Sequence, residues 1–208
     1  WFSPSVLPHA IIDFAIKDSS TIFTASDGGI IYKSSDSGNN WIEVASGYNS
    51  FSSIKFVNNY GFACGDYGFV LRSTNGGNSW STVFENEDLY NLNDLFFVDT
   101  LKGYFVGIDY EAHGLIYKTT NSGLNWFSLY SETSNTLNSV YFTGPETGYA
   151  VGYWGTIIKT TDGGGSPIGI EPISNNIPNE FKLFQNYPNP FNPITKIKFS
   201  IPNNSGSY

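Results

Sequence analysis

The sequence predicts an all-β protein that forms part of a β-propeller, with three complete four-stranded antiparallel blades and one partial blade. A segment that runs from a Gly-led strand into a polar turn recurs along the chain at a period of about forty residues, which is typical of stacked supersecondary units. The composition agrees with this prediction, because 22 Gly favour tight turns while 14 Tyr and 17 Phe favour strands.

Each repeat reads as short strands separated by turn residues. The first unit predicts strands near 11–16, 21–25, 30–34 and 41–45, and the second predicts strands at 53–57, 61–65, 69–73 and 80–84. A third set falls within 92–130, and three strands of a fourth set fall within 137–160. An isolated four-stranded sheet leaves two apolar faces uncovered, whereas sheets stacked around an axis cover them. A linear β-solenoid is the alternative architecture.

The polar turns carry a recurring pattern of Asp or Asn, then Gly, then Trp. The residues are Asp36, Gly38 and Trp41; Asn75, Gly77 and Trp80; Asn121, Gly123 and Trp126; and Asp162 with Gly164. We expect a structural role, in which the side-chain oxygen accepts hydrogen bonds from its own loop and the Trp packs between sheets. A calcium loop is excluded, because the twelfth residue counted from Asp36 is Gly47 and not Glu.

Composition excludes several classes of function. The net charge is -8 and Arg72 is the only arginine, so nucleic acid is not an expected partner. Cys64 is the only cysteine, which excludes an intrachain disulfide and a cysteine-rich zinc site. No apolar run is long enough to span a membrane. We expect no metal, since His9 is the only histidine companion of His113, and no cofactor.

Candidate binding residues lie in the variable loops at the end of the blades opposite the polar turns. They are Tyr67, Asp109, Tyr110, Glu111, His113, Tyr153 and Trp154. Aromatic platforms with polar neighbours suit sugars or peptides, so these residues predict a ligand-binding rim, with solvated loop tips as the alternative. We expect no catalytic residues. A sialidase would need three arginines around its substrate carboxylate, but a glycosidase with two facing carboxylates stays open.

The pattern S/T-x-D/N-x-G-x-x-W resembles the Asp box of bacterial neuraminidase repeats. Together with Gly148-Tyr-Ala-Val-Gly152 and Gly155-Thr-Ile-Ile-Lys-Thr-Thr-Asp-Gly-Gly164, it is more similar to the repeats of photosystem II assembly and stability factors. This resemblance covers residues 1–164 and implies a propeller, commonly of about seven blades. The fourth copy departs from the pattern, because Ser166-Pro167 stands where the Trp should follow.

A second resemblance covers residues 181–202, Phe-Lys-Leu-Phe-Gln-Asn-Tyr-Pro-Asn-Pro-Phe-Asn-Pro-Ile-Thr-Lys-Ile-Lys-Phe-Ser-Ile-Pro. This segment resembles the opening of the C-terminal sorting domain of the type IX (Por) secretion system in Bacteroidota-like bacteria. The resemblance implies a small β-sandwich at 181–208, truncated after Tyr208, and 165–180 reads as a linker. Trp1 stands in the register of the Trp of a preceding repeat, so we expect the chain to be a fragment with blades upstream.

The sequence therefore predicts a secreted or cell-surface, non-catalytic β-propeller that binds an extracellular protein or glycan. The second resemblance implies export by the type IX secretion machinery, which would be a further partner. An extracellular glycoside hydrolase or lyase on a propeller scaffold is one alternative. A photosystem-assembly-like factor is another, although the sorting segment argues against it because that family acts on photosynthetic membranes.

Overall fold

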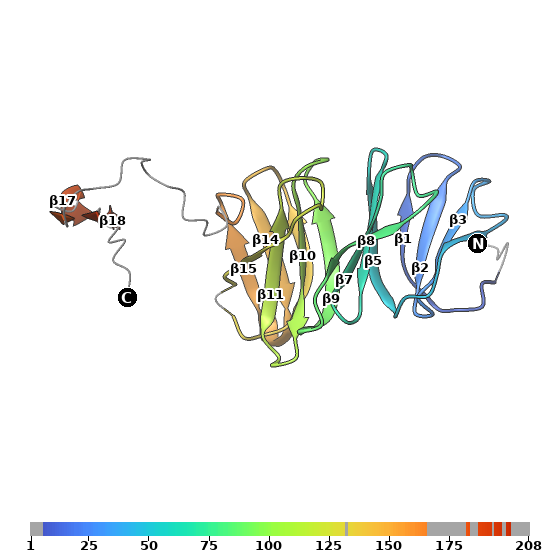
Figure 1. Ribbon diagram of the computed structural model, residues 1–208, viewed down its shortest axis with the longest axis horizontal. Coiled ribbons are helices and arrows are strands. Elements are labelled where there is room, and N and C mark those ends of the chain that lie inside the picture. The colour runs from blue at the N-terminus through green and yellow to red at the C-terminus, as the bar shows by residue number, and fades with distance from the viewer. Residues whose placement is uncertain are drawn as a thin grey trace, which may run out of the picture. The chain divides into compact units, whose positions relative to one another are not determined.

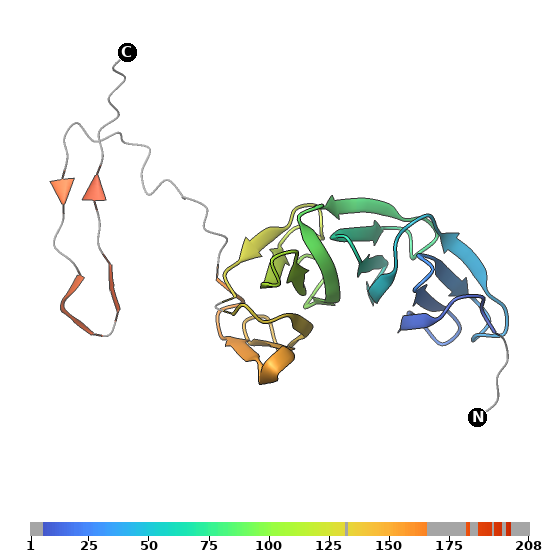
Figure 2. The same cartoon turned by 90° about the horizontal axis from the view of Figure 1, so that it is seen from below.

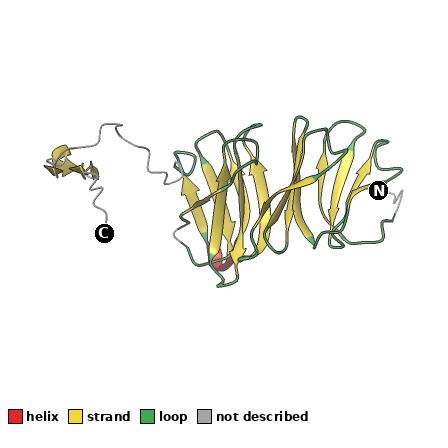
Figure 3. Ribbon diagram, viewed as in Figure 1, coloured by secondary structure: helices red, strands yellow, loops and turns green. Residues whose placement is uncertain are grey.

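The computed structural model describes residues 6–131, 133–165, 182–183, 187–192, 194–196 and 199–200. It divides the chain into two compact units, Trp1–Pro167 and Ile168–Tyr208. Within the first unit, antiparallel sheets follow one another around an arc (Figures 1 and 2). The unit is built mainly of strands joined by loops (Figure 3).

Each sheet of the first unit is a meander, in which neighbours in sequence are neighbours in space. Blade 1 contains β1 (Ile11–Ile16), β2 (Ile22–Ser26), β3 (Ile31–Ser34) and β4 (Ile42–Ala45). Blade 2 contains β5 (Phe51–Val57), β6 (Tyr60–Gly65), β7 (Phe69–Ser73) and β8 (Ser81–Glu85). Blade 3 contains β9 (Leu89–Phe97), β10 (Gly103–Asp109), β11 (Gly114–Thr119) and β12 (Phe127–Leu129). Blade 4 contains β13 (Leu137–Phe142), β14 (Gly148–Gly152) and β15 (Ile157–Thr160).

The prediction of a partial propeller with three complete blades and one partial blade is confirmed. Predicted strand ends differ from those observed by one or two residues in blades 1 and 2. Strand β5 begins at Phe51 because a bulge between Phe51 and Ser53 lets the pairing with β6 continue. One short 3-10 turn, η1 (Tyr153–Gly155), joins β14 to β15.

The hydrophobic cores lie between blades and not within them. One core joins Phe23 of blade 1 to Ile54 and Leu71 of blade 2. A second core joins blades 2 and 3, and a third joins blades 3 and 4. Cys64 is buried in the second core, where burial raises the pKa of its thiol. The apolar faces left bare by isolated sheets are thus covered by the next blade, as the repeat predicted.

A pair of stacked aromatic rings, one from each blade, occurs at each of the three described blade junctions. An aromatic ring from the second strand of one blade stacks on a ring from the first strand of the next. The pairs, with their centroid distances, are Phe23 and Phe56 at 4.4 Å, Phe62 and Phe97 at 3.8 Å, and Tyr104 and Phe142 at 4.0 Å. Each interplanar angle is 24° or less, so stacking adds to the area that these rings bury.

Two carboxylates connect the first strands of neighbouring blades, which lie side by side. Asp13 Oδ2 accepts hydrogen bonds from Ser53 Oγ at 3.1 Å and from the Ile54 amide at 2.9 Å. Asp94 Oδ2 accepts from Ser139 Oγ at 2.8 Å and from the Val140 amide at 3.1 Å. Ser53 Oγ also lies 3.1 Å from Asp94 Oδ1. These hydrogen bonds form a polar row across all four blades.

In the second unit, β16 (Lys182–Leu183) pairs with β19 (Phe199–Ser200), and β17 (Tyr187–Asn192) pairs with β18 (Ile194–Lys196), both antiparallel. All four of these strands fall within the segment 181–202 that carries the second resemblance. The small β-sandwich stays a prediction, and the linker at 165–180 lies outside the described residues apart from Gly165. Within the described part of the chain, no helix has the length and apolar character that a membrane crossing requires.

Candidate functional site

The polar turns between the third and fourth strands are closed by a hydroxyl as well as by Asp or Asn. In blade 3, Thr119 Oγ1 accepts from the Gly123 amide at 3.0 Å and donates to Asn121 Oδ1 at 3.1 Å. Asn121 Oδ1 in turn accepts from the Asn125 amide at 2.9 Å. Ser34, Ser73 and Thr160 make the corresponding contacts in the other blades. The recurrent Ser or Thr two residues before Asp or Asn was the sequence signal for this role.

The Trp of each complete polar turn lies against the preceding blade or against its own blade. Trp80 contacts the stacked pair Phe23 and Phe56, with centroids 6.4 and 5.8 Å away. Trp126 lies 6.0 Å from Phe97 and 4.7 Å from Phe105. Trp41 donates from Nε1 to Gly38 O at 3.0 Å. These turns therefore fasten blades together, and the Asp or Asn oxygen of each turn accepts a hydrogen bond within its own loop.

Gly77 shows why the turn needs glycine. Its φ of +83° is in the left-handed region, and an added Cβ would lie 2.3 Å from the ring of Phe23. The turn therefore approaches the preceding blade too closely for a side chain at this position.

Asp36 gives the first polar turn a measurable pH dependence. Hydrogen bonds from the backbone and side chain of Asn40, and from Ser34, lower its pKa from 3.8 to about 2. The folded pKa lies below the unfolded one, so this carboxylate stabilises the fold above about pH 4 and stops doing so as pH falls through about 2. We expect Asp36→Asn to fold at pH 7, because Asn75 and Asn121 hold this position in blades 2 and 3.

Urea midpoints measured between pH 7 and 2 check this prediction. Relative to wild type, Asp36→Asn should lose less stability between about pH 4 and pH 2. The exposed Asp88, replaced by Asn, serves as the control. Parallel pH profiles for wild type and Asp36→Asn would contradict the assignment.

The predicted rim lies at the turns between second and third strands. Tyr67 of blade 2, Tyr90 of β9 and Tyr110 of blade 3 are all about half-exposed. The Tyr67 amide donates to Tyr90 O at 2.7 Å, and the rings of Tyr90 and Tyr110 meet edge to face at 5.3 Å. The structure thus assembles three tyrosines from two blades, a group we call the tyrosine cluster. The sequence placed Tyr90 only in a link between blades, because its position relative to Tyr110 depends on the pairing of β9 with β10.

Two other rim residues belong to blade 4. Tyr153 and Trp154 form η1, and Trp154 is 91% exposed. Both Tyr67 and Trp154 adopt positive φ, 61° and 58°, immediately before a glycine that also has positive φ. Such turns normally place Asn or Gly at the first position, so a bulky aromatic there is uncommon. Each of these two turns therefore presents a large ring at its tip.

The polar rim residues of blade 3 mainly bind one another. Asp109 Oδ1 accepts from the amides of Glu111 at 2.9 Å and His113 at 2.8 Å. His113 Nδ1 lies 3.3 Å from Asp109 Oδ2 and 3.6 Å from Glu111 Oε2. Asp66, in the turn of blade 2, is partly buried, and this burial raises its pKa. Among the residues that the structure describes, no three His, Cys, Asp or Glu side chains gather as a metal site.

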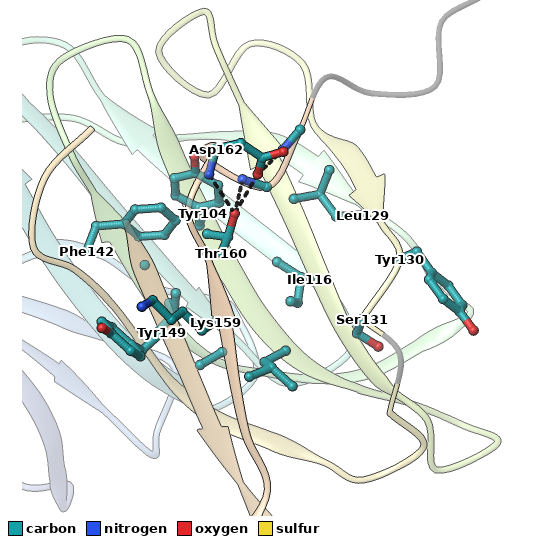
Figure 4. A pocket seen from close by; sticks show the side chains of 16 residues that line it. Tyr104, Ile116, Leu129, Tyr130, Ser131, Phe142, Tyr149, Lys159, Thr160 and Asp162 are labelled. Atoms are coloured by element: carbon teal, nitrogen blue, oxygen red, sulfur yellow. Dashed lines mark hydrogen bonds between the residues drawn. The ribbon is translucent and has the colours of Figure 1, made fainter. Parts of the chain in front are cut away.

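A separate groove of about 590 Å³ lies between blades 3 and 4 (Figure 4). Its apolar lining includes Tyr104, Leu129, Phe142 and Ile158. Tyr104 Oη donates to Gly163 O at 2.8 Å, and Lys118 Nζ donates to Gly165 O at 2.6 Å, at the end formed by the fourth polar turn. No residue of the predicted rim lines this groove.

Comparison with known proteins agrees with this architecture. The family model of the photosynthesis system II assembly factor YCF48 matches residues 12–140. A structure of YCF48 bound to a D1 peptide is 22% identical with a TM-score of 0.58, and it covers 73% of this chain and 53% of its own. YCF48 from Cyanidioschyzon merolae is 23% identical with a TM-score of 0.57, covering 76% of this chain and 55% of its own.

An ancestral GH74 enzyme is also similar in structure, with 22% identity, a TM-score of 0.63, and coverage of 77% of this chain and 24% of its own. No curated protein matches the chain. The chain spans about half the length of the YCF48 structures that it matches. The family model covers more than half of this chain, across repeats whose turns and inter-blade rings have the geometry described above. The chain therefore belongs to the family of the photosynthesis system II assembly factor YCF48.

Proposed function

We propose that this chain is a non-catalytic β-propeller module that binds a protein or a glycan outside the cell. The observation that carries the proposal is the tyrosine cluster of Tyr67, Tyr90 and Tyr110, exposed at the end of the blades away from the polar turns. Tyrosine offers an apolar ring and a hydroxyl, which suits both sugar faces and peptide side chains. A rigid scaffold that carries exposed aromatic rings on loops is a common arrangement for binding.

The arrangement of the acidic rim residues favours binding over hydrolysis. Asp109 accepts two amide hydrogen bonds within its own loop and faces His113, so this carboxylate organises the loop. Hydrolysis of a glycoside by two carboxylates needs both to face the substrate. An extracellular glycoside hydrolase is the second candidate, favoured by the likeness in fold to the GH74 enzyme and by the raised pKa of Asp66.

A photosystem-assembly role is the third candidate. One similar structure is described as YCF48 bound to a D1 peptide, which supports peptide binding as one form of the proposed activity. The sorting-like segment at 181–202 instead favours a protein outside the cell.

Binding at the rim is testable with polysaccharides and peptides as probes. The chain would be run in native gels containing a panel of soluble polysaccharides, and separately used to select from a displayed peptide library. We expect Tyr110→Ala to weaken binding of the selected probe by about tenfold, as for a central aromatic contact. Leu124→Ala, exposed on the opposite polar-turn end, is the matched control.

The same panel separates binding from catalysis. Release of reducing sugar that is lost in Glu111→Gln would favour the hydrolase. Binding that is equally strong in Tyr110→Ala and in wild type would show that the tyrosine cluster is not the site.

Export through the type IX machinery is the other part of the proposal. Its support is the continuous resemblance at 181–202, within a unit that is separate from the blades. In a bacterium that uses this pathway, removal of residue 181 and everything after it should leave the protein in the periplasm. Unchanged display on the cell surface would contradict this assignment and leave the binding proposal intact.

A further inference from the structure

Positive side chains of the blades lie away from the tyrosine cluster. Lys33 Nζ donates to Asn78 Oδ1 at 2.7 Å and Lys118 Nζ donates to Gly165 O at 2.6 Å, both in polar turns. The other Lys and Arg residues of the described blades also lie near this end, or on the inner polar row in the case of Lys55. They are Lys17, Lys55, Arg72, Lys102 and Lys159. Among the described residues of the four blades, the end that carries the tyrosine cluster therefore has no Lys or Arg.

Acidic residues gather around the tyrosine cluster instead. Each tyrosine of the cluster has an acidic residue within two positions in the sequence. These residues are Asp66 before Tyr67, Asp88 before Tyr90, and Asp109 and Glu111 on either side of Tyr110, with Glu87 in the same link as Asp88. The link lies against the turn of Tyr67, because the Asn86 amide donates to Gly68 O at 3.1 Å. The tyrosine cluster therefore lies in a region of negative charge.

These carboxylates differ in how far their charge is matched within the chain. Asp109 accepts two amide hydrogen bonds and lies 3.3 Å from His113 Nδ1. Glu87 and Asp88 are exposed, and no ion pair between described residues reaches them. Burial raises the pKa of Asp66, and a cation bound nearby would favour its charged form. This end of the blades thus carries negative charge that the described residues leave unmatched.

The blades themselves show how their aromatic rings meet cations. In each blade the Lys or Arg of the third strand lies over an aromatic ring of the second strand. The pairs, with the distance from Nζ or Cζ to the ring centroid, are Lys33 and Phe23 at 5.8 Å, Arg72 and Tyr60 at 5.0 Å, Lys118 and Tyr104 at 6.0 Å, and Lys159 and Tyr149 at 5.6 Å. Within the described residues, no such cation lies over a ring of the tyrosine cluster. The cluster therefore offers rings and carboxylates, the two groups that bind an ammonium or a guanidinium, without the cation.

We propose that the tyrosine cluster binds a basic segment of a protein, whose Lys or Arg side chains lie over the tyrosine rings and face the surrounding carboxylates. This inference rests on the proposed function and names the chemistry of its partner. The rings and carboxylates come from two turns and from the link between blades 2 and 3, so they suit a peptide with several cations. A neutral glycan would contact the rings but gain nothing from the charge. Opposite charge also speeds association and makes it sensitive to salt.

Fluorescence anisotropy with labelled peptides tests the proposal on the 208-residue chain. One peptide alternates arginine with glycine, and the second has glutamine in place of each arginine. We expect the arginine peptide to bind about tenfold more tightly or better, and to lose affinity as sodium chloride rises from about 0.05 to 0.5 M. Tyr110→Ala should raise its dissociation constant by about tenfold, as loss of a central aromatic contact does.

Two double variants test the role of the carboxylates. Glu87→Gln with Glu111→Gln removes two exposed charges beside the tyrosine cluster and should raise the dissociation constant of the arginine peptide by about fivefold. Glu43→Gln with Glu146→Gln removes two exposed charges nearer the polar turns and is the matched control. This control should change the dissociation constant by less than about twofold, because salt screens charges at that distance.

The outcomes separate this inference from the proposed function. Equal binding of the two peptides, or equal affinities of the two double variants, would overturn the basic partner. A neutral peptide or polysaccharide whose binding is lost in Tyr110→Ala would then leave the proposed function standing. Binding of the arginine peptide that is unchanged in Tyr110→Ala would show attraction by charge alone and overturn the tyrosine cluster as its site. Binding of the cationic polysaccharide chitosan without binding of the arginine peptide would assign the cluster to a glycan and overturn the protein partner.

Discussion

Replacing Trp126 by alanine is expected to lower the free energy of unfolding by about 3–5 kcal/mol. The indole lies against Phe97 and Phe105, so truncation removes apolar contacts and leaves a cavity in the junction between blades 2 and 3. The Trp126 Nε1 atom is buried and has no hydrogen-bond partner among the described residues, so the loss is one of packing. Urea unfolding, monitored by far-UV circular dichroism at one protein concentration throughout, measures this loss of free energy of unfolding.

Trp154→Ala is the matched control for this prediction. The same side chain is removed, but from a position that is 91% exposed, so the change should stay within about 0.5 kcal/mol. Equal losses for the two variants would show that Trp126 does not hold the blades together.

Replacing Asp94 by alanine should cost about 3 kcal/mol, because donors of two neighbouring blades lose a partly buried acceptor. Ser139 Oγ and the Val140 amide, in blade 4, would lose their shared partner. Ser53 Oγ would keep its hydrogen bond to Asp13 Oδ2. Because the lost contacts belong to the junction of blades 3 and 4, hydrogen exchange should increase most in β13 and its partner β14.

Asp88→Ala controls for the loss of one negative charge, since this residue is exposed in the link between blades 2 and 3. It should change the free energy of unfolding by no more than about 0.5 kcal/mol. If Asp94→Ala proved as mild as Asp88→Ala, the carboxylate row would contribute little to the junctions.

The repeat predicted the blades well because most strands are short and nearly every turn between them contains Gly, Asn or Asp. It could not predict the partners of Asp13 and Asp94, which lie about forty residues away in the sequence, beside register shifts at Ile11, Phe51 and Leu137. The tyrosine cluster, too, could be predicted only in part. The turn tips Tyr67 and Tyr110 were recognisable, whereas the place of Tyr90 beside them follows from strand pairing that no local pattern specifies.

The polar row formed by Asp13, Ser53, Asp94 and Ser139 has a consequence for the number of blades in a closed ring. Blades 1 and 3 contribute Asp13 and Asp94 to this row, whereas blades 2 and 4 contribute Ser53 and Ser139 at the same position. Acceptor and donor therefore alternate across the four described blades, so within them the polar row repeats every two blades. A closed ring with an even number of blades of this kind would keep the alternation all the way round. An odd ring would set two aspartates or two serines side by side at one junction, where either a charge repulsion or a missing acceptor would weaken the closure.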